Sequence, residues 1–222
     1  MIRSAIELFR EHGYSGTGLR EINAHSGVAR GAIYHHFPGG KAELAEEVLV
    51  ATGQMVKQGL AMLASSGDAV AMLDGFVAAW KQNLAATGYR AGCSVVAIVA
   101  ESRRDAPQLA RTAARVFASW NTVIAGVLAR QGVKRAEARR LATLTVSSIE
   151  GGVILCRAAG EARALDEVGS ALRSMYRAAI ESVQGSRNPI AGPHAAKVPR
   201  RASRTQSNGT TMNPKTAKGG TR

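Results

Sequence analysis

The sequence predicts an all-α protein of about nine helices in two domains. Apolar residues recur at spacings of three and four along most of the 222-residue chain, the pattern of amphipathic helices. Runs that alternate polar and β-branched residues, as a half-buried strand would, are few. Glycine, proline and capping residues divide the helical pattern into segments. We therefore expect a small N-terminal domain over residues 1–47, a larger helical domain over 48–184, and a tail over 185–222.

Three short helices are expected in the N-terminal domain. The first stops at Gly13, which can adopt a left-handed C-cap conformation. Thr17 can cap the second through its hydroxyl, and Gly27 ends that helix after about two turns. The third runs over residues 30–36, before the helix-breaking segment Phe37-Pro38-Gly39-Gly40. Two short helices joined by a tight glycine turn form a helix-turn-helix.

The remaining helices are separated by equally clear breaks. One long helix begins at Lys41 and ends at the turn cluster Ser65-Ser66-Gly67, so it connects the two domains. Asp68 can cap the next helix, which ends before the break over residues 88–92. The last four helices are expected over residues 94–104, 107–131, 135–159 and 163–184.

The net charge of +13 does not by itself indicate a nucleic-acid binder, because of where the charges lie. Residues 185–222 carry eight Lys or Arg and no acid, whereas residues 1–47 carry five basic and six acidic residues. The tail is also rich in Gly, Pro, Ser and Thr, so we expect a disordered basic tail. Any DNA binding by the N-terminal domain must therefore be argued from its motif.

The segment of residues 17–44 carries that motif, TGLREINAHSGVARGAIYHHFPGGKAEL. The helix expected over residues 30–36 presents small residues, which permit close approach to DNA. The major groove is wide enough to admit one such helix. Arg30 can pair with guanine or phosphate, and tyrosine and histidine side chains can donate to phosphate. The candidate DNA-binding residues are Thr17, Arg20, Ala29, Arg30, Gly31, Tyr34, His35, His36 and Lys41.

The same segment resembles the TetR/AcrR family signature. The matching residues are Thr17, Ile22, Gly27, Val28, Gly31, Tyr34, His36, Phe37, Lys41 and Leu44. A weaker resemblance to one branch continues through Gly92-Cys93 and Ile149-Glu150-Gly151-Gly152. The chain departs from the pattern at Asn23, Ser26 and Ala29, which predicts an unusual operator.

This resemblance implies a ligand-responsive DNA-binding transcriptional regulator in the cytoplasm. Such a protein is a repressor that a small hydrophobic effector releases from a palindromic operator in double-stranded DNA. It also implies a homodimer formed by the last two ordered helices, here residues 135–182, because two-fold symmetry matches palindromic half-sites. Activation in place of repression stays open, since the motif reports only DNA binding.

An effector pocket in such a domain lies between helices and is mostly apolar. Apolar and aromatic residues at helical spacing are also ordinary core residues, so that reading stays open for each candidate. Glu101 and Glu150 lie within apolar helices, where an exposed or interface carboxylate is the commoner explanation. The candidate ligand-binding residues are Met72, Phe76, Trp80, Val96, Val99, Phe117, Trp120, Asn121 and Ile149.

Other function classes find less support in the sequence. No Ser-His-Asp set, phosphate loop or paired carboxylates can be picked out, so we expect neither an enzyme nor a cofactor. Cys93 and Cys156 lie far apart without further ligands at metal-site spacing; a redox switch stays an alternative to two inert buried thiols. The N-terminus has neither a signal peptide nor a spanning segment, so no membrane partner is expected. A nonspecific architectural DNA binder driven by the tail is the second candidate function.

Overall fold

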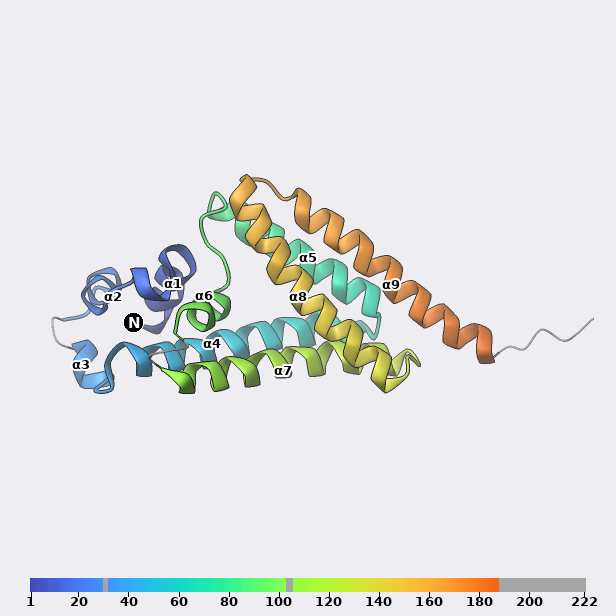
Figure 1. Ribbon diagram of the computed structural model, residues 1–222, viewed down its shortest axis with the longest axis horizontal. Coiled ribbons are helices and arrows are strands. Elements are labelled where there is room, and N and C mark those ends of the chain that lie inside the picture. The colour runs from blue at the N-terminus through green and yellow to red at the C-terminus, as the bar shows by residue number, and fades with distance from the viewer. Residues whose placement is uncertain (30–31, 103–105, 188–222) are drawn as a thin grey trace, which may run out of the picture. The chain divides into compact units, whose positions relative to one another are not determined.

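The computed structural model describes residues 1–29, 32–102 and 106–187, without the side chains of 186 and 187. These residues belong to one compact unit and form nine α-helices and one short 3₁₀ helix, with no strand among them (Figure 1). The predicted all-α fold is confirmed. The predicted disorder of the tail lies outside the described residues.

Three helices form the N-terminal motif: α1 (Ile2–Gly16), α2 (Leu19–Ser26) and α3 (Ala32–His36). Gly27 ends α2, as the sequence predicted, and it does so in the left-handed conformation at φ 67°. Buried Phe9, Ile22 and Ile33 contribute one side chain from each helix to the core. Such large buried side chains fix the angle between short helices that would be marginal alone.

Two local predictions at the start of this motif have different outcomes. The first helical stretch breaks at Gly13 as predicted, where φ is 80° and ψ is 173°, and a second stretch continues α1 from this kink to Gly16. Thr17 does not cap α2, because its hydroxyl donates to the Gly13 carbonyl at 2.8 Å. The N-cap is Gly18, whose N–H donates to Glu21 Oε2 at 3.3 Å. The Thr17 hydroxyl thus bonds to the carbonyl four residues earlier, as Ser and Thr side chains commonly do in helices.

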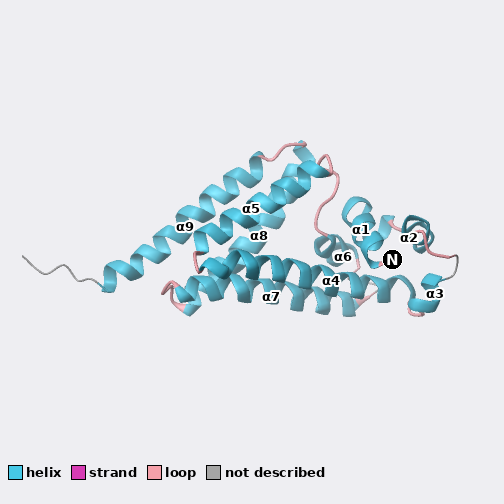
Figure 2. Ribbon diagram, turned by 180° about the vertical axis from the view of Figure 1, so that it is seen from behind, coloured by secondary structure: helices cyan, strands magenta, loops and turns pink. Residues whose placement is uncertain are grey.

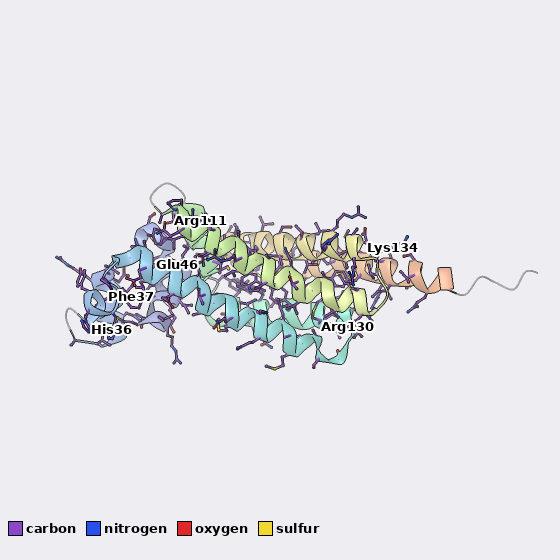
Figure 3. All side chains as sticks on the ribbon, turned by 90° about the horizontal axis from the view of Figure 1, so that it is seen from below. His36, Phe37, Glu46, Arg111, Arg130 and Lys134 are labelled. Carbon is purple, nitrogen blue, oxygen red and sulfur yellow. The ribbon has the colours of Figure 1, made fainter. Side chains whose placement is uncertain are left out.

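Two long helices, α4 (Gly40–Leu63) and α7 (Pro107–Arg130), lie side by side and run in the same direction (Figures 1 and 2). Trp120 of α7 donates its indole N–H to the Gly53 carbonyl of α4 at 3.0 Å. A Cβ at Gly53 would lie 2.7 Å from Val116 Cγ2, so only glycine allows this approach. Figure 3 shows His36 and Phe37 near one end of this pair, and Arg130 and Lys134 near the other.

The other helices complete the C-terminal part: α5 (Ala69–Ala86), α6 (Ser94–Glu101), α8 (Arg135–Ala159) and α9 (Arg163–Arg187). Asp68 caps α5 as predicted, accepting from the N–H of Val70 and Ala71 at 2.8 and 3.1 Å. Helix α8 packs between α7 and α9, and α5 packs against α9. Helix α6 packs against α1, which joins the N-terminal motif to the rest of the unit.

Helix α8 is long and apolar enough to cross a membrane by length and composition, with a mean hydropathy of 1.3. Such a composition is also that of a core helix, and α8 buries Leu141, Val146, Ile149 and Val153 against its neighbours. Packing against the neighbouring helices accounts for the buried part of this apolar sequence.

Candidate nucleic-acid interface and internal cavity

The helix-turn-helix exposes one face of α3. Ile33 and the adjoining Phe37 are buried and anchor the helix, while Tyr34, His35 and His36 are exposed, Tyr34 by 57%. An exposed tyrosine beside two histidines offers hydrogen-bond donors without bulk charge, which suits contact with phosphate and base edges.

Most predicted DNA-binding residues that the structure describes lie on the surface. Arg20 and Ala29 are exposed along with the three α3 side chains, and Arg20, Ala24 and Tyr34 line a surface hollow between α2 and α3. Arg30 and Gly31 lie outside the described residues. The structure therefore presents an exposed face of α3 with a basic residue of α2 beside it.

Thr17 and Lys41 are placed differently from the other candidates. Thr17 is completely buried with its hydroxyl bonded to Gly13, so its side chain is not exposed for the predicted DNA contact. The Lys41 ammonium lies 4.4 Å from the centroid of the Tyr14 ring and 3.5 Å from the Ser15 carbonyl. Burial lowers the pKa of Lys41, and these contacts tie the start of α4 to the end of α1.

Asn23 is a structural residue of the motif that the sequence analysis treated only as a departure. Its Nδ2 donates to the Val28 carbonyl across the turn at 3.3 Å, and its Oδ1 is buried without a hydrogen-bond partner among the described residues. The bond ties α2 to the turn before α3. A polar residue replacing alanine in the middle of a short helix was the signal available in the sequence.

A cavity of about 160 Å³ that opens to the surface lies between α1, α4, α5 and the entry to α6. Phe76 and Trp80 line it, as the sequence analysis proposed for a ligand pocket. Most of the wall is apolar, and one part is polar. The apolar members are Ile6, Met55, Val56, Leu60, Leu63, Phe76, Ala79 and Trp80, and the polar ones are Arg10, Thr52, Asn83 and Ser94.

The other predicted ligand-binding residues do not line this cavity. Met72, Trp120 and Ile149 are at most 1% exposed and belong to the core, where Trp120 is held by its hydrogen bond to Gly53. The remaining four are half-buried on α6 and α7: Val96, Val99, Phe117 and Asn121. Helical periodicity identified inward-facing residues, but which of these border a void depends on how neighbouring helices fit together.

Arg10 on α1 is the main residue of the cavity that the sequence analysis missed. Its Nε donates to the Gly92 carbonyl at 2.8 Å, and its Nη2 donates to Asn83 Oδ1 at 2.6 Å. The Gly92 N–H donates in return to the Arg10 carbonyl at 2.8 Å. Nearby, the Ser15 N–H donates to Glu101 Oε2 at 2.6 Å. These bonds connect the N-terminal motif to α5 and α6, and no sequence pattern signals a pairing between segments so far apart.

Glu150 and Cys93 form a buried pair beside this junction. Glu150 is only 8% exposed, so the expectation of an exposed or interface carboxylate is wrong. Burial raises the pKa of Glu150 to about 7, while a hydrogen bond with Cys93 opposes that rise. Burial also raises the pKa of the Cys93 thiol well above its usual value, and Glu150 adds to that effect. Both cysteines are free and buried, which disfavours the redox-switch alternative.

The last two helices expose apolar side chains. Leu144, Ile154 and Leu155 on α8 and Met175 on α9 are between 37% and 59% exposed. Leu144 and Leu155 lie eleven residues apart, three helical turns, so they share one face. Exposed apolar side chains on two neighbouring helices are typical of an interface.

Two family models match the chain and together cover most of it. Residues 1–48 match the model described as bacterial regulatory proteins, tetR family. Residues 69–171 match the model of the C-terminal domain of LmrA/YxaF-like transcriptional regulators.

Named relatives and solved structures agree with these models. An uncharacterized HTH-type transcriptional regulator of Mycobacterium tuberculosis is 34% identical over 186 residues, covering 81% of this chain and 94% of the relative. The HTH-type transcriptional regulator LmrA of Bacillus subtilis is 26% identical over 178 residues, covering 80% and 95%. The crystal structure of regulatory protein TetR from Rhodobacter sphaeroides superposes with a TM-score of 0.71 at 21% identity, covering 78% and 95%. The similarity to this solved structure shows a shared fold.

Proposed function

Because the chain belongs to the TetR family and is therefore a DNA-binding transcriptional regulator, we propose that it is a repressor released from a palindromic operator by a small hydrophobic effector. It acts in the cytoplasm as a homodimer, without a cofactor or enzymatic activity. Residues 1–47 bind DNA, and residues 48–184 bind the effector and the second subunit.

The observation that carries this proposal is the exposed face of α3. Tyr34, His35 and His36 extend from a helix whose other side is anchored by Ile33 and Phe37. An anchored helix with exposed polar side chains can enter the major groove, with the exposed Arg20 of α2 supplying nearby positive charge.

The apolar face of α8 and α9 supports the homodimer. Leu144, Leu155 and Met175 would be covered by the same residues of a second copy, as an isologous two-fold interface requires. Such a dimer places two copies of α3 related by two-fold symmetry, which matches a palindrome.

The cavity supports the effector response because it touches both parts of the chain. Its walls include α1 of the helix-turn-helix and α4, which runs directly from α3 into the larger domain. A ligand that fits better when α4 is displaced changes the spacing of the two copies of α3. For a near-complete switch it must bind the DNA-free state several kcal/mol more tightly.

Selection of bound sequences from random duplex DNA at near-physiological salt tests the DNA-binding proposal. We expect the full chain to enrich a palindrome and Tyr34→Ala to lose that enrichment, because the substitution removes an exposed contact without touching the core. Met62→Ala is the matched control, since Met62 is 74% exposed on α4 away from α3. Tight binding without enrichment would instead favour the architectural function driven by the tail.

A further inference from the structure

The polar part of the cavity wall contains a cation that makes no close ion pair with any described residue. Arg10 is half-buried, and burial lowers the pKa of its guanidinium, while the carboxylates of Glu11 and Glu7 oppose that shift from beyond ion-pair distance. Among the described residues, no carboxylate oxygen lies within salt-bridge distance of it. Its two hydrogen bonds go to uncharged acceptors, Gly92 O and Asn83 Oδ1, and use two of the five N–H groups of a guanidinium. A partly desolvated guanidinium with donors to spare favours an anionic acceptor.

The guanidinium lies at the cavity wall because Asn83 and Gly92, which accept its hydrogen bonds, also line the cavity. Of the described lining residues, Arg10 is the one that carries a charge. Thr52 and Ser94, whose hydroxyls lie 3.0 Å apart, are further polar groups in the lining. The remaining wall, including Phe76 and Trp80, is apolar.

A second groove, of about 310 Å³ between α1, α6 and α8, also borders Arg10 but has a lining of mixed charge. Arg157 and His12 line it together with the carboxyl groups of Glu11, Glu101 and Glu150. An anionic molecule with an apolar body therefore fits the first cavity better, because no carboxyl group of the described residues lines that wall.

We propose that the effector is an apolar carboxylic acid whose carboxylate binds the guanidinium of Arg10, with its hydrocarbon part against Phe76 and Trp80. This inference rests on the proposed effector response and names its chemical class. Arg10 is an α1 residue, so the ligand head touches the DNA-binding motif directly. Its carboxylate competes with Gly92 and Asn83 for the guanidinium, which loosens α1 from α5 and from the entry to α6.

Calorimetric titration of the full-length protein with 4-phenylbutyrate and with its uncharged amide, 4-phenylbutanamide, tests the proposal. We expect the wild type to bind the acid at least about tenfold more tightly than the amide, because only the acid forms a charge-assisted hydrogen bond. In Arg10→Met that preference should disappear. Equal affinity of the wild type for both probes, or no binding of the acid at millimolar concentration, would overturn the proposal.

Asn83→Asp tests the same site with the guanidinium left in place. The new carboxylate pairs with Arg10 from inside the protein, so acid affinity should fall about tenfold or more while amide affinity stays within about threefold. Gln82→Asp is the control, because it adds the same charge one residue away on an exposed side chain outside the cavity lining. Unchanged acid affinity in Asn83→Asp would overturn the proposal even if Arg10→Met fails to fold.

Operator binding measured on the same preparations separates this inference from the proposed function. If the protein selects a palindrome but binds acid and amide equally, the carboxylate site is rejected and the DNA-binding function stands. If the protein prefers the acid but its operator affinity does not change when acid is added, the carboxylate site stands and the proposed effector response is rejected.

Discussion

Burial decides the chemistry of single residues in this protein, most clearly at Glu150. Its carboxyl group lies beside Cys93, and its pKa is raised to about 7 from an ordinary 4.5. In the unfolded chain the same group loses its proton near pH 4.5, so between these values the folded state binds more protons. Folding stability contributed by this group therefore falls as the pH rises from about 4.5 through 7.

Glu150→Gln should remove this pH dependence. Between about pH 4.5 and pH 8 the wild type should lose up to about 3 kcal/mol more unfolding free energy than the variant, because the ionised carboxylate must be buried only in the wild type. Urea unfolding at the two pH values measures the difference. Glu161→Gln, at an exposed residue just after α8, should leave the pH dependence unchanged; parallel curves for wild type and Glu150→Gln would contradict the argument.

At the scale of secondary-structure elements, the contact between α4 and α7 depends on one glycine, Gly53. A side chain at Gly53 would meet both methyl groups of Val116, at 2.7 and 3.0 Å, and the Gly53 carbonyl accepts the bond from Trp120. Gly59, six residues further along α4, has nothing within 4 Å of its ideal Cβ. The helix thus contains one glycine needed for packing and one that merely lowers helix propensity.

Gly53→Ala and Gly59→Ala should therefore change stability in opposite directions. We expect Gly53→Ala to lower the unfolding free energy by about 1–3 kcal/mol through overpacking against α7. Gly59→Ala should raise it by up to about 1 kcal/mol through helix propensity. Thermal or urea unfolding without ligand measures both, and a neutral or stabilising Gly53→Ala would show that α7 moves aside at little cost.

At the scale of the whole molecule, the important feature is the apolar face that exposed side chains of α8 and α9 form. Leu155 is 59% exposed on α8, and covering it by a second copy would remove apolar surface from water. A dimer also binds two operator half-sites at once, so the loss of dimerisation lowers the affinity for a palindrome.

If the proposed dimer forms through α8 and α9, Leu155→Glu should convert it to a monomer and weaken operator binding about 100-fold or more, because a carboxylate buried in that interface would have no partner. Sedimentation analysis at micromolar concentration and a binding titration on the selected operator measure the two effects. Met62→Glu carries the same charge change on exposed α4 and should stay dimeric. A monomeric variant with full operator affinity would separate dimerisation from DNA recognition.

Local chemistry in the sequence determined the helices, the helix-turn-helix and the family. The Asp68 cap, the left-handed turn at Gly27 and the breaks at Gly67 and Gly160 depend on neighbouring residues, so the corresponding helix boundaries could be predicted closely. The exposed side of α3 followed from the same periodicity, with Tyr34 outside and Ile33 inside.

Only the tertiary structure decided which residues are buried together. Thr17 and Glu150 are polar in the sequence and buried in the fold, and Arg10 meets Gly92 across 82 residues of chain. Phe76 and Trp80 border the cavity, whereas other inward-facing residues such as Ile149 are simply core. Periodicity shows which way a side chain faces on its own helix. A void or a buried polar contact arises from the fit between helices distant in sequence, which no local pattern records.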